Sequence, residues 1–183
     1  MVLDRLKKVS IVALILCVLW MSYLIGCIIF LERKMPMPTA NILPKSYRKA
    51  IDILESTYDK NYKIKSKEEY RKIICEDLGL KFYFYSEKEL VGYAGKTYPL
   101  IRLIVLDSEI DGIKYCETFA HEAFHLKHFT GQEDYVCFQT FKYLYESNEL
   151  HNCGVLYGLW QIYGFYSGEY NIPDLIVDYL TNK

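Results

Sequence analysis

The sequence lacks any tract rich in lysine and arginine, and its formal net charge at pH 7 is only −1. Nucleic-acid-binding surfaces concentrate positive charge, so the composition gives no reason to expect DNA or RNA as a partner. The chain also lacks internal repeats and low-complexity segments. Its 183 residues are enough for one domain and an appendage.

No two of the six cysteines have C-x-x-C spacing. Cys17 and Cys27 lie in an apolar run, and the even number that remains would permit two disulfides. These remaining cysteines lie in apolar helical patterns, which favour buried free thiols. They are Cys75, Cys116, Cys137 and Cys153.

Charged residues are absent from 9 to 31, a run of 23 residues. As a helix this run would be about 35 Å long, which is enough to cross the hydrocarbon core of a bilayer. A cleaved signal peptide would have a shorter apolar run and a cleavage site of small residues, and neither is evident. We therefore expect residues 1–34 to form a single-pass membrane anchor that contacts the lipid bilayer.

A lipid anchor is the alternative, because Leu24-Ile25-Gly26-Cys27 resembles the cleavage box of bacterial lipoproteins, with Cys27 as the modified residue. The chain stays apolar from Ile28 to Leu31, however, where mature lipoproteins usually turn polar. Positive residues flank the apolar run on both sides and barely discriminate between its two orientations. Both sides of the membrane are thus possible locations for the globular domain, and we narrowly favour the cytoplasmic side.

Residues 35–43 are expected to be a short linker stiffened by Pro36 and Pro38, and residues 44–183 to be the globular domain. Pro44 suits the first turn of a helix that runs to about Asp59. Ser66 and Glu69 have capping-box spacing for a second helix that ends before Gly79.

The next part of the domain has strand-like patterns over 81–85, 90–93 and 100–106. We expect these strands to form a small antiparallel sheet whose edge can bind an extended polypeptide through main-chain hydrogen bonds. Further helices are expected over 154–165 and 173–180, with Trp160 in the core. The fold class is therefore predicted to be α+β.

His121-Glu122-Ala123-Phe124-His125 lies between these strands and the last helices and has the pattern H-E-x-x-H. Residues four apart lie one turn above each other on a helix, so both imidazoles can bind one metal ion. Two structural histidines would not explain the carboxylate between them. The chemistry typical of this pattern is zinc-assisted hydrolysis, with His121 and His125 as ligands of Zn²⁺ and Glu122 as the general base that activates a zinc-bound water.

A catalytic zinc site normally has a third protein ligand. His128 lies on the same helix face, but it is about 10 Å of helical rise from His121, too far to share the ion. We expect His128 to line the cleft or to contact a ligand. Gly131 is expected to end the helix, and a second helix that begins at Glu133 would fold back towards His125.

Glu133 is therefore the favoured third metal ligand, and Asp134, Glu146 and Glu149 are the alternatives. An acidic residue at a helix N-terminus is also favoured by the helix dipole alone, so this assignment is weaker than that of the histidines. His151 or one of the tyrosines is a candidate for stabilising the oxyanion of the reaction.

The segment from Thr118 to His128, followed by Glu133 and an aromatic-rich helix, resembles the ImmA/IrrE-type zinc metallopeptidases. The resemblance covers about 82–147 and implies a minimal zincin fold, in which a short strand precedes the active-site helix. The strand expected near 101–107 fits that place. It further implies that a glutamate early in the next helix completes the metal site, and Glu133 is the residue in that place.

The sequence therefore predicts a membrane-tethered, zinc-dependent endopeptidase that acts on a protein or peptide substrate. A non-catalytic, zinc-containing binding or regulatory membrane protein is the alternative. A membrane-bound partner protein with a vestigial metal site is a further one. The substrate, the cleavage specificity and the oligomeric state cannot be read from the sequence.

Overall fold

The computed structural model describes residues 18–20, 44–88, 90, 93–165 and 172–183. The chain divides into two units, Met1–Met37 and Pro38–Lys183. The expected transmembrane helix over 9–31 lies outside the described residues except for 18–20, which are helical, and so do Cys27 and the linker. Among the helices of the described residues, none is both long and apolar enough to cross a membrane.

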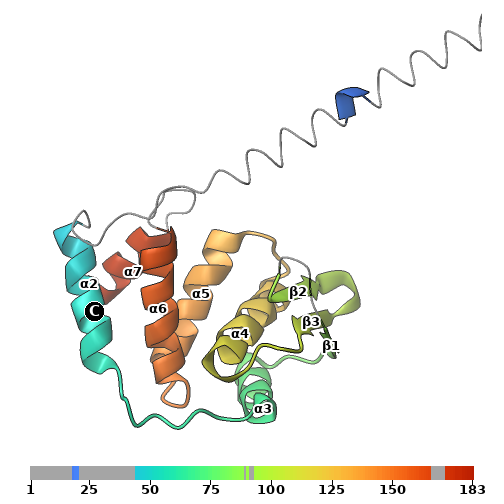
Figure 1. The fold of residues 1–183 in the computed structure, drawn as a ribbon, viewed down its shortest axis with the longest axis horizontal. Coiled ribbons are helices and arrows are strands. Elements are labelled where there is room, and N and C mark those ends of the chain that lie inside the picture. The colour runs from blue at the N-terminus through green and yellow to red at the C-terminus, as the bar shows by residue number, and fades with distance from the viewer. Residues whose placement is uncertain (1–17, 21–43, 89, 91–92, 166–171) are drawn as a thin grey trace, which may run out of the picture. The chain divides into compact units, whose positions relative to one another are not determined.

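The second unit has helices and a small sheet, which confirms the α+β class (Figure 1). In chain order its elements are α2 (Lys45–Thr57), α3 (Lys67–Leu78), β1 (Tyr83–Glu87), β2 (Gly95–Tyr98), the 3₁₀ helix η2 (Pro99–Ile101), β3 (Leu103–Asp107), α4 (Gly112–His128), α5 (Glu133–Glu146), α6 (His151–Phe165) and α7 (Ile172–Thr181).

The three strands form a mixed sheet with the order β1-β3-β2, so the prediction of an antiparallel sheet is wrong. β2 pairs with β3 in the antiparallel sense through the short η2 connection, whereas β1 is parallel to β3. The second strand lies over Gly95–Tyr98, and the described residues of the strand expected over 90–93, Leu90 and Tyr93, are not in a strand. The reason is the turn: η2 and the left-handed Arg102 (φ 51°) reverse the chain immediately after Tyr98, which sets the register of its pairing with Leu103.

α4 is the central helix of this unit and packs against α3, α5, α6, β2 and β3 (Figure 1). Several of its apolar residues, among them Cys116, Phe119 and Ala120, are fully buried in the core. Core contacts on several sides fix the axis and the rotation of the helix. The side chains of its remaining face therefore have a defined direction.

The predicted helix ends agree with the structure in α3, at the start of α5 (Glu133) and at the end of α6 (Phe165), and differ by one to three residues at other ends. Ser66 and Glu69 form the expected capping box, and Gly79 ends the helix with φ 64°, a conformation that favours glycine. Pro44 is the N-cap of α2 and not part of its first turn. Trp160 is 53% exposed, so its prediction as a core residue is wrong.

The four cysteines of the described domain are free, as the sequence indicates. Cys116, Cys137 and Cys153 are buried and Cys75 is half-buried. Ile162, two residues further along α6, is fully buried in the core, whereas Trp160 lies on the other side of the helix and lines the cleft.

Candidate metal centre

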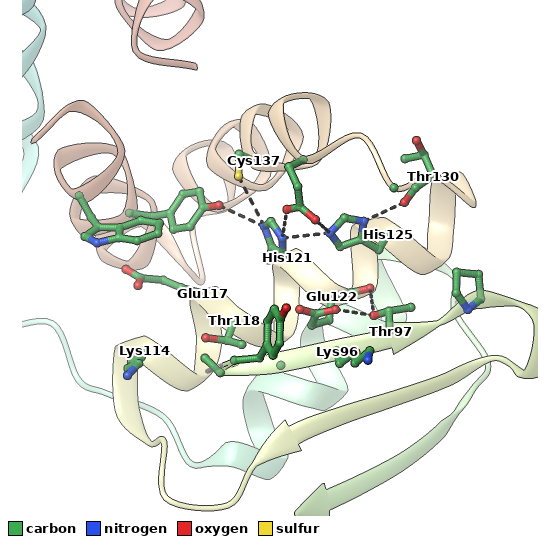
Figure 2. Close-up of a pocket in the computed structure, with 18 of the residues that line it drawn as sticks. Lys96, Thr97, Lys114, Glu117, Thr118, His121, Glu122, His125, Thr130 and Cys137 are labelled. Carbon is green, nitrogen blue, oxygen red and sulfur yellow. Dashed lines mark hydrogen bonds and ion pairs between the residues drawn. The ribbon is translucent and has the colours of Figure 1, made fainter. Parts of the chain in front are cut away.

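The side chains of His121, His125 and Glu133 converge on one point between α4 and the start of α5 (Figure 2). The two Nε2 atoms of the histidines are 3.0 Å apart. Glu133 places Oε2 3.1 Å from Nε2 of His121 and Oε1 3.2 Å from Nε2 of His125. The three predicted ligands are thus brought together, from one face of α4 and from the first residue of α5.

These distances match what a zinc ion requires of its ligands. Donor atoms about 2 Å from a tetrahedral ion lie roughly 3.3 Å from one another. Two imidazole nitrogens and one carboxylate are the donors of a common type of catalytic zinc site. His121, His125 and Glu133 also line an open cleft, so a fourth position would be accessible to water or substrate. The residues present therefore fit zinc.

His125 is oriented by the turn that follows α4. Its Nδ1 is 2.8 Å from the backbone carbonyl oxygen of Thr130, so this nitrogen carries the proton and Nε2 is left to bind a metal. Phe129 turns the chain back with φ 50°, which is a left-handed conformation that costs a non-glycine residue about 1 kcal/mol. The helix therefore ends at Phe129 and not, as predicted, at Gly131.

His121 is oriented by side chains of α5 and α6. Its Nδ1 lies 3.3 Å from the hydroxyl of Tyr157 and 3.8 Å from Sγ of Cys137 (Figure 2). His121, Glu133 and Cys137 themselves make up a second group of donors within 4.8 Å of one another. Cys137 approaches Nδ1, however, whereas Nε2 faces both other predicted ligands. We therefore favour the group that contains His125.

Glu122 lies beside the converging ligands and borders the cleft, although only 7% of it is exposed. The hydroxyl of Thr97, on β2, is 2.7 Å from its Oε2 and 2.9 Å from its backbone oxygen. Gly95 on the same strand makes this approach possible, because a Cβ there would lie 2.8 Å from Cγ of Glu122. β2 thereby fixes the position of the carboxylate.

The charges of the centre depend on one another. Burial alone would lower the pKa of His121, but hydrogen bonds with Cys137 and Glu133 outweigh it and raise the pKa to about 10. Hydrogen bonds from His121 and His125 hold the pKa of Glu133 far below its usual range. Burial raises the pKa of Glu122. A metal ion would therefore compete with a proton for the imidazole of His121.

The alternative third ligands lie away from the centre. Asp134 accepts a hydrogen bond from the backbone of the next residue, Tyr135. Glu146 pairs with Lys183 and accepts a hydrogen bond from Tyr179, and Glu149 pairs with Lys65.

The structure also contradicts the predicted roles of two other histidines. His128 is exposed, stacks on Phe124 and does not line the cleft, because the helix turns it away. His151 is within 3.2 Å of the backbone oxygens of Thr57 and Tyr145. It connects α6 to its neighbours and has no access to the cleft as an oxyanion-stabilising group.

The cleft extends along α4 beyond the metal centre. One turn before His121, Glu117 lines the cleft together with the α6 residues Leu156 and Trp160. Burial raises the pKa of the Glu117 carboxyl to about 8, although the charge of Lys114 opposes this shift. The carboxyl of Glu117 therefore tends to keep its proton at neutral pH, because its environment is partly apolar.

The residues that position the ligands and Glu122 are not evident from the sequence alone. Two signals were available: a glycine inside a strand often marks a close backbone approach, as at Gly95, and Cys137 lies one turn after Glu133. No local signal connects Thr97, Thr130 or Tyr157 with the centre, because long-range packing brings them there.

No protein-family model, curated protein or solved structure matches this chain. The assignment of the site therefore depends on its geometry and on the sequence pattern.

We expect Tyr157→Phe to weaken zinc binding about tenfold, because the hydroxyl that orients His121 is lost while the ring is kept. Titration against a competing chelator measures the change. Tyr163→Phe is the matched control, since Tyr163 is on the same helix and 44% exposed. Equal affinities in all three proteins would show that the hydroxyl does not orient the ligand.

We expect Glu117→Gln to stabilise the protein increasingly as the pH rises from about 5 to 8. The pKa of Glu117 is 4.5 in the unfolded chain and about 8 in the folded protein. The contribution of this carboxyl to the free energy of unfolding is therefore fully present below pH 4.5 and is lost as the pH rises to about 8. Between these limits the difference in unfolding free energy should grow by up to about 1.4 kcal/mol per pH unit. Denaturant unfolding of both proteins at several pH values tests this, and a constant difference would contradict it.

Proposed function

We propose that the chain is a zinc-dependent endopeptidase that hydrolyses peptide bonds of a protein substrate. The observation that carries the proposal is the convergence of His121, His125 and Glu133 within 3.0–3.2 Å, with Glu122 beside them. A purely structural zinc site would need the three ligands but not a carboxylate held at the wall of an open cleft.

His121, His125 and Glu133 would hold the metal. Bound zinc supplies a Lewis acid that polarises the carbonyl of the scissile bond and makes water more acidic. Glu122 takes the proton of the attacking water and returns it to the leaving amine. Burial raises the pKa of the Glu122 carboxyl, which makes the group a stronger base for the proton of water. The Thr97 hydroxyl keeps the carboxylate in place.

The walls of the cleft favour a polypeptide as substrate. β2 is at an edge of the sheet and lines the cleft, so its free backbone groups can pair with an extended chain. Large apolar side chains also lie exposed along the cleft: Leu100 is 88%, Phe129 63% and Trp160 53% exposed. Exposed apolar surface of this kind is typical of a binding site for a protein or peptide.

We also propose that the domain is a minimal zincin related to the ImmA/IrrE-type metallopeptidases. The sequence pattern from Thr118 to Glu133 supports this relation. We further propose that the chain is tethered to a membrane, and the support for this is the uncharged run 9–31. Free thiols in the described domain agree with a catalytic domain on the cytoplasmic side.

We expect Glu122→Gln to keep zinc and to lose at least about a hundredfold in the rate of peptide hydrolysis, because the base is removed and the ligands remain. Metal analysis and a protease assay of the purified full-length protein measure both properties. Glu109→Gln, at an exposed position on the loop before α4, is the control and should behave as the wild type. A non-catalytic zinc protein would show no difference among the three, and a vestigial site would hold no zinc.

Gly95→Ala should also keep zinc but reduce hydrolysis about tenfold or more. The added methyl group would lie 2.6 Å from Leu106 and 2.8 Å from Glu122, so the base must move relative to the ligands. Gly131→Ala adds a methyl group to the same cleft without a neighbour within 4 Å and should leave the rate unchanged. An unchanged rate in Gly95→Ala would mean that the position of Glu122 is not limiting.

A further inference from the structure

Glu117 is placed where the side chain of a bound peptide would reach. It precedes His121 by four residues on α4, which is about 6 Å of helical rise. Figure 2 shows Glu117 in the part of the cleft nearest Lys114, with His121 between it and His125. A residue next to the scissile bond would hold its backbone near the metal centre. Its side chain could then extend over this distance along the cleft.

The other carboxyl groups of the cleft are engaged by neighbours. Glu133 faces both histidines, and Glu122 accepts from Thr97. Among the described residues, Glu117 has no ion pair and no side-chain hydrogen bond. Lys114 is exposed one turn away, and its charge lowers the pKa of Glu117 less than burial raises it. Glu117 is thus the acidic group of the cleft that remains available to a ligand.

The surroundings of Glu117 suit a long cationic side chain. Ile113, one turn before Glu117 on α4, and the α6 residues Leu156 and Trp160 line the cleft as well. Lysine and arginine place their methylene groups on apolar surface while the charged end reaches a polar partner, and a tryptophan ring adds a cation–π attraction. A neutral side chain of equal length would gain the apolar contacts but would leave the half-buried carboxyl of Glu117 without a cationic partner.

We propose that Glu117 is the specificity-determining residue of the cleft and selects substrates with lysine or arginine next to the scissile bond. This inference rests on the proposed peptidase function. An acidic side chain at the same place would bring a second carboxyl group next to Glu117 without a cation between them, so at least one of the two would have to stay protonated, and such a substrate is disfavoured. Attraction of one charge and rejection of the other together define the substrate class.

Binding can be measured separately from cleavage with the full-length Glu122→Gln protein loaded with zinc. The probe is a pool of randomised eight-residue peptides that includes norleucine, an uncharged analogue of similar length to lysine. We expect the retained peptides to contain lysine or arginine over norleucine by about tenfold or more at one position, which corresponds to about 1.4 kcal/mol.

Three further variants, each combined with Glu122→Gln, test whether the charge of residue 117 determines the preference. Glu117→Gln should abolish the preference for a cation over norleucine, and Glu117→Lys should replace it by a preference for aspartate or glutamate. Lys114→Gln neutralises the nearby charge and should keep the preference for lysine and arginine. Thermal unfolding identifies a variant that fails to fold, and Glu117→Gln then carries the test because it keeps nearly the same side-chain shape.

The proposal would be overturned by a preference that does not change with residue 117, by the absence of any cationic preference, or by a pool from which no peptide is retained. Failure of the proposed function looks different, because wild type and Glu122→Gln would then be equally unable to cleave the retained peptides. If both proposals hold, the wild type should cleave those peptides, and Glu117→Gln should lower kcat/KM only for the cationic ones.

Discussion

The close approach of the first residue of α5 to the histidine face of α4 is the constraint on which the candidate site depends. Only four residues, 129–132, separate the two helices, so Glu133 cannot move far from His125. Phe129 accepts a left-handed conformation in this turn, and the same turn gives the carbonyl of Thr130 to His125. The backbone cost of the turn is offset by the fixed orientation of a ligand.

Three carboxyl groups in one cleft have different properties because their neighbours differ. Two imidazoles pair with Glu133 and lower its pKa, so it remains charged and suits a metal ligand. Glu122 meets one hydroxyl and is buried, which raises its pKa and suits proton transfer. Burial raises the pKa of Glu117 as well, but no side chain donates a hydrogen bond to this carboxyl among the described residues. Chemically identical groups can have different roles in one site when their environments give them different pKa values.

The sequence predicts the parts of the site that depend on local periodicity. His121, Glu122 and His125 share a helix, and Glu133 begins the next one, so spacing alone is enough to propose their meeting. The mixed sheet and the position of β2 were not predicted, because strand pairing depends on turns such as η2 and on long-range contacts. The sequence also predicts, wrongly, that Trp160 lies in the core, because nothing in an apolar helix distinguishes a residue that borders a cleft from one that is buried.

β2 connects substrate binding with the proposed base. The strand lines the cleft, carries the hydroxyl that holds Glu122, and reaches that residue closely only because position 95 has no side chain. A peptide that pairs with the free edge of β2 would add hydrogen bonds to a strand that is otherwise held on one side, by β3. Since a strand paired on both sides is more rigid than an edge strand, binding would also restrict the movement of Thr97. The same contact would thus position the substrate and the group that activates water.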